Sequence, residues 1–251
     1  MGLESPLRRL LPDSGETTVG ELLEDYGPGD HAPSGRPFVF TNFALTVDGH
    51  ATIDGRSGAI GSDTDTAMLV GLRTHPDAVM IGAGTLRAEG YGRVVSDPAK
   101  RELRERRGLS PDPLMVVVSN RLEIPWDAPL FTEGAGEVLI FTASDREAPA
   151  TATPVEIVRH PSRVNLVALL TGLRADRGIR SVLCEGGPTL HGELLAAGLV
   201  DELFVTRSPR IAGGTGPGLA EGLEQAHTRE LDLRWLCESG GELYARYAAT
   251  A

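Results

Sequence analysis

The sequence predicts an α/β fold: a single domain whose mixed, mostly parallel central sheet is flanked by helices and ends in a C-terminal β-hairpin. Short apolar runs recur along the chain, and amphipathic segments stand between them. Such alternation is typical of parallel strands that are covered on both faces. Two final strands, expected at 232–237 and 242–247, flank Gly240-Gly241 and therefore predict the hairpin.

Residues 1–35 are expected to form an N-terminal extension, and residues 36–251 the domain itself. Within the extension, Thr17 or Thr18 could cap a short helix that the Gly27-Pro28 pair ends. Core strands are expected at 38–46, 78–81, 114–118, 138–141, 155–158, 180–183 and 202–206. Helices are expected at 62–72 and 164–173 and from Pro188 to about Gly198, with a helical or loose segment at 98–107.

Composition and charge exclude several classes of function. The formal net charge of −11 argues against a nucleic-acid partner, because such a partner needs a basic face. No apolar stretch approaches the length of a membrane span, and no signal-peptide pattern opens the sequence. Cys184 and Cys237 are the only cysteines, too few for a disulfide framework. We therefore expect a cytoplasmic protein that binds a small molecule, without a nucleic-acid or membrane partner.

The junction at 180–190 is the most informative stretch. A buried strand is expected to end near Glu185, a glycine pair follows, and Pro188 suits the first turn of a helix, where its missing N–H costs nothing. Gly186 and Gly187 lack the Cβ atoms that would keep an anion away from the backbone N–H groups. The junction is therefore a candidate phosphate cradle, although many such turns use glycine only for tight packing.

A second junction of the same kind follows the apolar run 78–81, which enters Gly82-Ala83-Gly84-Thr85. The alternative is a tight turn in which Thr85 acts as a plain N-cap. Two such junctions in one domain suit a ligand with two phosphates, such as a dinucleotide. Neither junction has the Gly-x-Gly-x-x-Gly spacing of a Rossmann fingerprint or the Lys-Ser/Thr ending of a P-loop, so both of those folds are disfavoured.

Further polar positions have both a functional and a structural interpretation. Ser119 and Arg121 follow an apolar strand, where a hydroxyl and a guanidinium suit the extra phosphate of NADP and where a polar turn is the alternative. Asp65 could be only a capping residue, and Arg73 could only complement a helix dipole. Glu185 is expected at the end of a buried strand, where burying its charge costs free energy unless the carboxylate has a partner or a function.

No metal site is expected, because the six histidines are scattered along the chain. His191-Gly192-Glu193 imitates the His-x-Glu of zinc deaminases, which also need a Pro-Cys-x-x-Cys pair. Only one cysteine lies downstream of His191, so a deaminase is excluded. A serine hydrolase is disfavoured because the chain has no Gly-x-Ser-x-Gly elbow.

Four motifs in a fixed order carry a resemblance to a known family. They are Asn42–Gly49 (Asn-Phe-Ala-Leu-Thr-Val-Asp-Gly), Asp54–Gly58, Gly82–Thr85 and Glu185–Leu190 (Glu-Gly-Gly-Pro-Thr-Leu). Together they resemble the reductase domain of riboflavin biosynthesis, the family of 5-amino-6-(5-phosphoribosylamino)uracil reductases, over residues 36–247. In bifunctional members a zinc deaminase domain precedes the reductase. That half is missing from this sequence, so the resemblance implies a stand-alone reductase.

The resemblance implies a dihydrofolate-reductase-like fold, NADPH as hydride donor, and a homodimer. The residues that it places against NADPH are Ala44, Thr85, Glu89, Ser119, Gly186, Gly187, Pro188, Thr189 and Leu190. The two cradles and the polar turn add Gly82, Gly84 and Arg121 to the cofactor-binding candidates. The residues that it places against a phosphorylated substrate are Ser57, Arg73 and Glu185.

One departure from the family pattern concerns the substrate. Many members have Asp-Asp-Pro where this chain has Glu89-Gly90-Tyr91. In this respect the chain resembles a stand-alone subgroup in which Asp65 lies near the substrate ring. Asp65 is therefore both a substrate-binding and a catalytic candidate.

Three hypotheses of function follow. In the first, NADPH reduces 5-amino-6-(5-phosphoribosylamino)uracil to the ribitylamino product: a hydride reaches C1′ of the open imine form of the sugar, and the catalytic candidates Asp65 or Glu185 hold the protonated imine. In the second, the same fold and cofactor reduce dihydrofolate or another pterin, whose ring Asp65 would bind. In the third, the chain is an NADP-binding module without catalysis. The small-molecule partner is accordingly a phosphorylated pyrimidine or a pterin-like compound.

Overall fold

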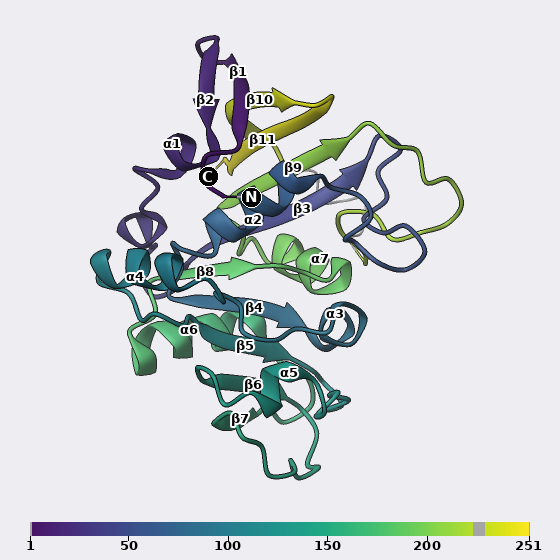
Figure 1. Ribbon diagram of the computed structural model, residues 1–251. Coiled ribbons are helices and arrows are strands. Elements are labelled where there is room, and N and C mark those ends of the chain that lie inside the picture. Colours follow the sequence, from purple (N-terminus) through teal and green to yellow (C-terminus); the bar gives the residue numbers. More distant parts are fainter. Residues whose placement is uncertain (1, 223–228, 251) are drawn as a thin grey trace. The chain divides into compact units, whose positions relative to one another are not determined.

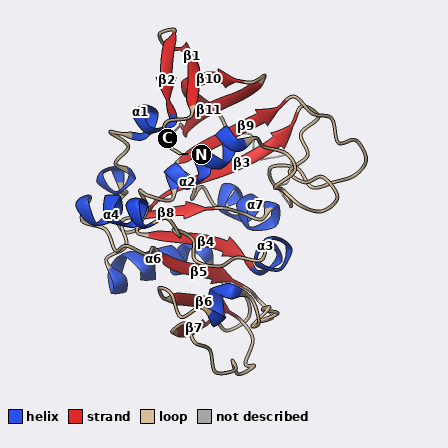
Figure 2. Cartoon of the chain, viewed as in Figure 1, coloured by secondary structure: helices blue, strands red, loops and turns tan. Residues whose placement is uncertain are grey.

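The computed structural model describes residues 2–222 and 229–250 and divides the chain into two compact units. Unit 1 consists of Met1–Gly27, Val39–Leu72 and Pro188–Ala251. Unit 2 consists of Pro28–Phe38 and Arg73–Gly187. Figure 1 labels the helices and strands, and Figure 2 distinguishes them by colour. Each unit is described by itself below.

Unit 2 is built on a parallel sheet of five strands in the order β8-β4-β5-β6-β7. Their bounds are β4 Ala78–Gly82, β5 Leu114–Val118, β6 Val138–Thr142, β7 Val155–Arg159 and β8 Ser181–Cys184. The central strands are mainly Val, Ile, Leu and Met, and most of their side chains are buried. Such uninterrupted apolar runs are what a parallel sheet covered on both faces requires.

The helical segments of unit 2 are η1 Pro28–His31, α3 Ala83–Glu89, α4 Pro98–Arg106, α5 Pro129–Thr132 and α6 Leu166–Arg177. Local signals explain several of their ends. The Asp97 side chain accepts a hydrogen bond from the N–H of Ala99 and so caps α4, and the Asn165 side chain caps α6 in the same way. Gly90 and Gly178, both with positive φ, end α3 and α6.

Unit 1 is built on a mixed sheet in the order β2-β1-β10-β11-β9-β3. Its strands are β1 Pro6–Leu11, β2 Gly15–Thr18, β3 Phe38–Thr46, β9 Glu202–Ser208, β10 Leu231–Ser239 and β11 Glu242–Ala249. Strands β3 and β9 are parallel, and all other neighbours are antiparallel. The register places Ala44 opposite Thr206 and Tyr244 opposite Thr206, so residues of β3, β9 and β11 meet along one line across the sheet.

Three helices belong to unit 1: α1 Val19–Leu23, α2 Asp63–Leu72 and α7 Pro188–Ala196. Thr18 and Glu21 form a reciprocal capping box at the start of α1. Helix α2 approaches α1 closely at Gly71, where a Cβ atom would lie 2.8 Å from a methyl carbon of Leu23. The Ser62 side chain accepts hydrogen bonds from the N–H groups of Thr64 and Asp65 and caps α2, as predicted.

The predicted fold class, a mixed and mostly parallel sheet with flanking helices and a C-terminal hairpin, is confirmed. Strands β1 and β2 were not predicted. They pair with each other, and β1 also pairs with β10, so the first 18 residues supply two strands of the sheet of unit 1. Thr85 is not an N-cap: α3 begins at Ala83, the cap position is Gly82, and no side chain caps this helix.

In the described part of the chain, no helix has both the length and the apolar character needed to cross a membrane.

Candidate functional site

The two glycine junctions lie next to each other in unit 2. Strands β4 and β8 are hydrogen-bonded neighbours, with Met80 opposite Cys184, so both junctions leave the sheet at the carboxyl ends of adjacent parallel strands. Beyond the strands, the N–H of Gly82 donates to the carbonyl oxygen of Gly186 over 2.8 Å. Gly186 has a φ of +92°, which L side chains rarely adopt. Ligands of open α/β sheets bind at this end of the strands.

The space around these glycines fits a ligand that approaches the backbone. A Cβ atom at Gly187 would lie 2.8 Å from Oγ1 of Thr85, closer than a side chain tolerates. At Gly84, which is exposed, the nearest atom to such a Cβ is a nitrogen of Arg87, 4.0 Å away. Gly187 is therefore packed against Thr85, whereas the open position at Gly84 leaves room beside the backbone for a phosphate group.

The remaining cofactor candidates are distributed over both units. In unit 1, Ala44 is half-buried on β3, Pro188 starts α7, and Leu190 is buried in that helix. The exposed Thr189 donates a hydrogen bond to Glu221 over 3.2 Å. In unit 2, Glu89 is the exposed last residue of α3.

Arg73 and Glu185 form a buried, two-pronged ion pair in unit 2. The guanidinium Nε and Nη2 of Arg73 donate to the two carboxylate oxygens of Glu185 over 2.7 and 2.6 Å. The hydroxyl of Tyr91 donates to the same carboxylate over 2.7 Å. The Glu185 side chain is 4% exposed, so its charge is balanced by these partners rather than by water. The ion pair with Arg73 and the hydrogen bond from Tyr91 offset the free-energy cost of burying the Glu185 charge.

The charge of Glu185 also shifts the titration of both partners. Burial lowers the pKa of the Arg73 guanidinium, but the charge of Glu185, the hydrogen bond to it and the contributions of Tyr91 together outweigh burial and raise this pKa above its ordinary value. Burial and then the Glu185 charge raise the pKa of the Tyr91 hydroxyl well above its ordinary value. Tyr91 therefore stays a neutral hydrogen-bond donor. Tyr91 was not among the predicted site residues, although the departure Glu89-Gly90-Tyr91 from the family pattern marks its position.

Asp65 lies in the first turn of α2 in unit 1 and is half-buried. Burial, opposed by a hydrogen bond from the Thr206 hydroxyl and reinforced by the negative charge of Glu242, raises the pKa of Asp65 to about 6. Its Oδ1 atom is buried and has no hydrogen-bond partner. Asp65 is thus more than the capping residue that the sequence alone permits. Ser57, the other substrate candidate of unit 1, is exposed in the loop before α2.

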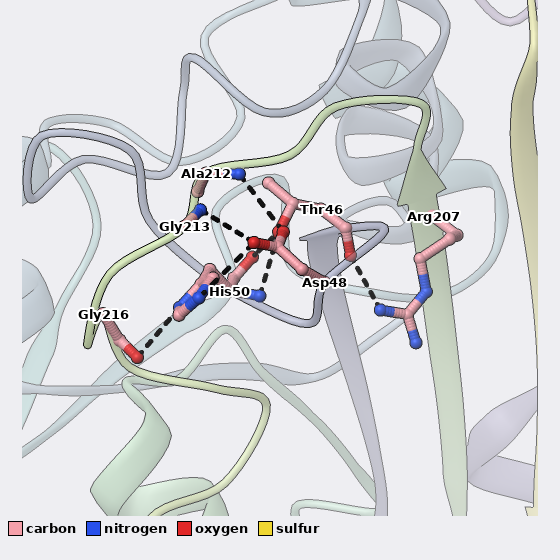
Figure 3. Close-up of polar contacts among 7 residues, drawn as sticks. All are labelled: Thr46, Asp48, His50, Arg207, Ala212, Gly213 and Gly216. Carbon is pink, nitrogen blue, oxygen red and sulfur yellow. Dashed lines mark hydrogen bonds and ion pairs between the residues drawn. The ribbon is translucent and has the colours of Figure 1, made fainter.

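Asp48 joins two loops of unit 1, as Figure 3 shows. Its carboxylate accepts hydrogen bonds from the Thr46 hydroxyl over 2.5 Å and from the N–H groups of Ala212 and Gly213 over 3.2 and 2.7 Å. The bonds from Thr46 and Gly213 contribute most to holding the pKa of Asp48 well below its usual range. Nε2 of His50 lies 3.6 Å from the same carboxylate.

Backbone contacts extend this connection along both loops. The ring of His50 is hydrogen-bonded to the carbonyl oxygen of Gly216 over 3.0 Å, and the N–H of Ala51 donates to the carbonyl oxygen of Pro217 over 2.8 Å. The guanidinium of Arg210 donates to the carbonyl oxygen of Ala59, in the loop that carries Ser57. The turn at Asp48-Gly49 is therefore hydrogen-bonded to the segment 210–217. Arg210 of that segment in turn contacts the loop that carries Ser57.

A cavity of about 510 Å³ lies in unit 2. Arg87 from α3, Trp126 from the segment after β5 and Arg146 from the segment after β6 line it. The aromatic face and the two guanidinium groups can contact an adenosine that carries a phosphate, and the carboxylates of Glu123 and Glu147 belong to the same lining. Within the described residues, the lining does not include Ser119, which is 6% exposed, or Arg121, whose side chain is exposed on the turn after β5.

The structure thus brings the glycines of both cradles together with Thr85, and it brings Arg73 together with Glu185. Asp65 belongs to unit 1 and Glu185 to unit 2, and each is described within its own unit. Among the residues that the structure describes, no group of His, Cys, Asp and Glu side chains could hold a metal ion.

Comparison with known proteins assigns the family. Residues 37–243 match the RibD C-terminal domain. The chain belongs to this family. It is 33% identical over 183 residues to the 2,5-diamino-6-ribosylamino-4(3H)-pyrimidinone 5′-phosphate reductase of Archaeoglobus fulgidus, a match that covers 71% of this chain and 83% of that protein. It is 30% identical to the reductase of the same name from Methanothermobacter thermautotrophicus, covering 84% of this chain and 98% of that protein.

A longer relative matches over part of its length, and two solved structures have the same fold. The riboflavin biosynthesis protein RibD of Bacillus amyloliquefaciens is 30% identical over 75% of this chain, which spans 50% of that protein's length. A pyrimidine reductase-like protein from Corynebacterium diphtheriae has the same fold, with a TM-score of 0.77, 23% identity, and coverage of 94% of this chain and 100% of that chain. The riboflavin biosynthesis reductase Rib7 of Saccharomyces cerevisiae has a TM-score of 0.69 at 19% identity, covering 92% of this chain and 99% of that chain. Membership of a reductase family implies a nicotinamide cofactor, which the open position at Gly84 in unit 2 fits.

Proposed function

We propose that this protein is an NADPH-dependent reductase of riboflavin biosynthesis that converts 5-amino-6-(5-phosphoribosylamino)uracil into its ribitylamino product. The observation that carries the proposal is the pair of glycine junctions in unit 2, where Gly82 is hydrogen-bonded to Gly186 and position 84 is open. Family membership supports the choice of a phosphorylated ribosylaminopyrimidine as substrate.

The proposed preference for NADPH over NADH rests on three arginines near the expected adenosine end, although Glu123 and Glu147 also line the cavity there. Arg87 and Arg146 line the cavity beside Trp126, and Arg121 lies on the turn after β5. Guanidinium groups bind phosphates in a fixed, forked geometry, so they suit the 2′-phosphate that only NADPH carries. When bound, NADPH supplies the hydride.

We assign Asp65 as the proton donor of the reaction. Reduction of the open imine form of the sugar adds a hydride at C1′ and leaves the attached nitrogen with a proton. Because burial holds the pKa of Asp65 at about 6, a substantial share of its carboxyl groups stays protonated in weakly acidic solution, as a proton donor requires. Arg73, Glu185 and Ser57 are assigned to substrate binding, with Tyr91 fixing the carboxylate of Glu185.

A second candidate substrate keeps the 2-amino group on the ring. The two archaeal relatives at 33% and 30% identity are both named for the 2,5-diamino-6-ribosylamino-4(3H)-pyrimidinone 5′-phosphate. The reducible carbon is the same in both compounds, so the same residues would serve either substrate. The difference lies in the pyrimidine ring, and measured catalytic efficiency with each compound decides between them.

The test is oxidation of NADPH by the purified protein with each pyrimidine phosphate and with dihydrofolate, followed by mass spectrometry of the product. We expect oxidation with at least one pyrimidine phosphate and a product that has gained two hydrogen atoms. Turnover of dihydrofolate alone would instead support a pterin reductase. NADPH binding without turnover of any of the three would support a cofactor-binding module and overturn the proposal.

We also propose a cytoplasmic homodimer, as the family resemblance implies. Cys184 and Cys237 are both free and buried, which is consistent with a reducing compartment. Sedimentation of the purified protein across a range of concentrations measures the assembly, and a monomer at every concentration would contradict it.

A further inference from the structure

Strands β3 and β9 of unit 1 end side by side, and the chain remains connected beyond them. Thr46, the last residue of β3, lies opposite Ser208, the last residue of β9. One residue further, the N–H of Val47 donates to the carbonyl oxygen of Arg210 over 2.8 Å. The two segments that follow these strands therefore start from neighbouring points.

Asp48 continues this connection, and two of its partners come from the segment after β9 (Figure 3). Its Oδ1 accepts the N–H of Ala212 over 3.2 Å, and its Oδ2 accepts the N–H of Gly213 over 2.7 Å. An aspartate that only forms a turn bonds to backbone groups close to it in sequence. These two donors lie 164 and 165 positions further along the chain. The carboxylate is therefore a bridge between two loops.

His50 adds a second contact between the same loops. A carbonyl oxygen can only accept, so Nδ1 of His50 carries the hydrogen in its bond of 3.0 Å to Gly216. A Cβ atom at position 216 would lie 3.1 Å from that Nδ1, so that one of the two groups would have to move. Glycine at position 216 therefore permits close packing of the segment 209–217 against the turn at 48–50.

Arg210 connects this bridge to the loop 53–60, which carries Ser57. Its carbonyl oxygen is bonded to Val47, and its guanidinium donates to the carbonyl oxygen of Ala59. Arg210 is exposed, and a long exposed side chain loses conformational entropy when it holds one contact. Such a contact is more favourable where the backbone is already fixed, as it is here by the bonds to Val47 and Asp48.

We propose that Asp48 is a positioning residue for substrate binding. It holds the segment 209–217 and thereby fixes Arg210, which keeps the loop 53–60 in the conformation that presents Ser57 to the substrate. The inference rests on the proposed function for the role of Ser57, whereas the ordering of the loop is a property of unit 1 itself. Loss of the bridge should lower the population of the binding-competent loop. The apparent affinity for substrate falls with that population, while the step in the filled site does not change.

Two variants break the connection at different points. Asp48→Asn leaves one acceptor oxygen in place of two, so at least one backbone N–H of the segment 209–217 loses its partner. Arg210→Met keeps a long apolar side chain and removes the donor to Ala59. Because Arg210 is exposed, this variant carries both measurements below if Asp48→Asn does not fold.

The matched control is Glu238→Gln. Glu238 is also a carboxylate of unit 1 that accepts a backbone N–H, that of Gly241 over 3.0 Å. Its side chain is 26% exposed, compared with 28% for Asp48. Its side-chain partner is Arg8 of β1, so its replacement disturbs a similar exposed carboxylate away from both loops.

The first measurement is hydrogen exchange of backbone amides in the free protein. Within the loop 53–60, the N–H groups of Ile53 and Ile60 donate to the carbonyl oxygens of Arg56 and Ser57, over 2.9 Å each. In Asp48→Asn and in Arg210→Met these two amides should exchange about threefold faster or more, because the loop opens more often.

Glu238→Gln should speed exchange at Gly241 and leave the loop 53–60 as in the wild type. If exchange at Ile53 and Ile60 is unchanged in both Asp48→Asn and Arg210→Met, the loop does not depend on the bridge and the inference is overturned.

The second measurement separates KM from kcat for the pyrimidine phosphate that the wild type reduces. In Asp48→Asn and Arg210→Met, KM should rise about three- to tenfold, the effect of losing one ordered contact. The value of kcat and the affinity for NADPH should stay close to those of the wild type, and Glu238→Gln should change neither KM nor kcat. The double variant should have a KM no higher than that of the more severe single variant, because both changes break one connection. Independent effects that multiply in the double variant would overturn the route through Arg210.

The two measurements also separate this inference from the proposed function. If the wild type reduces no pyrimidine phosphate but exchange in the loop 53–60 rises as expected, the proposed function fails and the ordering of the loop by Asp48 stands. If reduction occurs and KM is unchanged in both Asp48→Asn and Arg210→Met, the positioning role is wrong and the proposed function stands.

Discussion

A Cβ atom at Gly61 would lie 2.0 Å from Oδ2 of Asp65 and 2.5 Å from its Cγ. The carboxyl group of Asp65 therefore occupies the space that a side chain at position 61 would need. Gly61 has an ordinary backbone conformation, so this close approach, and not its φ angle, excludes larger residues. The placement of Asp65 thus depends on the absence of one methyl group in the preceding loop.

Replacing Gly61 by alanine should push the Asp65 carboxyl group away from Thr206 and Glu242. We expect a loss of about 1 to 3 kcal/mol in the free energy of unfolding, as for other overpacked sites. We also expect at least a tenfold loss of kcat, with the affinity for NADPH retained. Gly58→Ala is the control, because a Cβ atom there meets no atom within 4 Å. Equal activity in the two variants would show that the position of Asp65 is unimportant for turnover.

Glu185→Gln tests whether the Arg73–Glu185 pair serves the substrate or the fold. If the carboxylate binds substrate, kcat/KM should fall about ten- to a hundredfold, since a charge-assisted contact contributes roughly 1.5 to 3 kcal/mol. The melting temperature should then stay close to that of the wild type. A clearly lower melting temperature with full activity of the folded enzyme would assign the pair to structure alone.

Tyr91→Phe is a second test of the role of Glu185, because the Tyr91 hydroxyl donates to its carboxylate. It removes one hydrogen bond to Glu185 and leaves the ion pair with Arg73 in place. If Glu185 binds the substrate, the variant should have a higher KM than the wild type and a nearly unchanged melting temperature. A change in stability without a change in KM would again favour a structural role.

The sequence predicted the parts of the site that depend on residues close together along the chain. Apolar runs ending in glycines located both strand-to-helix junctions, and the spacing of Ser62 and Asp65 located the start of α2. The Glu185 carboxylate was marked as needing a partner, and the family motif placed Arg73 in the same site. These features are local because a turn or a helix cap involves only a few neighbouring residues.

The partners that come from distant strands could not be predicted. Glu242 and Tyr244 stand at the start of β11, and only the order of strands β11, β9 and β3 brings that end near α2. Likewise, Trp126 and Arg146 follow different strands of unit 2 and line one cavity. Strands β1 and β2 carry Pro6 and Gly15, residues that disfavour strands. The pairing of β1 with β10 and of β2 with β1 overrides that local preference.

Gly84→Ala is the sharpest test of the cofactor cradle, because the position is open. Alanine has a higher helix propensity than glycine, so the first turn of α3 should lose no stability. If the diphosphate approaches this backbone, affinity for NADPH should fall at least tenfold, about 1.4 kcal/mol. Gly187→Val should also weaken binding, but it would clash with Thr85, so its stability must be measured alongside. Unchanged affinity in a stably folded Gly84→Ala protein would exclude the cradle.

The preference for NADPH should reveal which arginines meet the 2′-phosphate. Arg121→Ala should weaken NADPH binding more than NADH binding if the turn after β5 binds that phosphate. The same comparison with Arg87→Ala and Arg146→Ala tests the cavity beside Trp126. A different result is that Arg87→Ala and Arg146→Ala weaken only NADPH binding while Arg121→Ala affects both cofactors equally. That result would show that the 2′-phosphate contacts the cavity and not the turn.

His191 should make the stability of the protein depend on pH. Its ring is 0% exposed, it stacks on Phe43 with the ring centroids 4.6 Å apart, and its Nδ1 is hydrogen-bonded to the carbonyl oxygen of Leu219 over 2.9 Å. Burial, opposed by that hydrogen bond, lowers the pKa of His191 from 6.5 to about 4. The unfolded chain therefore binds the proton first as the pH falls.

The sign of the effect follows from that order. Stability from His191 is fully present above about pH 6.5 and is lost as the pH falls toward 4, by at most about 3 kcal/mol at roughly 1.4 kcal/mol per pH unit. The raised pKa of Asp65 acts in the opposite direction between 3.8 and about 6, so the slope of the wild type alone is not decisive. The difference between the wild type and His191→Gln isolates the histidine, because glutamine can still donate to Leu219 and does not titrate. Denaturant unfolding at several pH values should show the two proteins converging in stability as the pH falls from 7 to 4.5, and a constant difference would contradict the assignment of a neutral, buried His191.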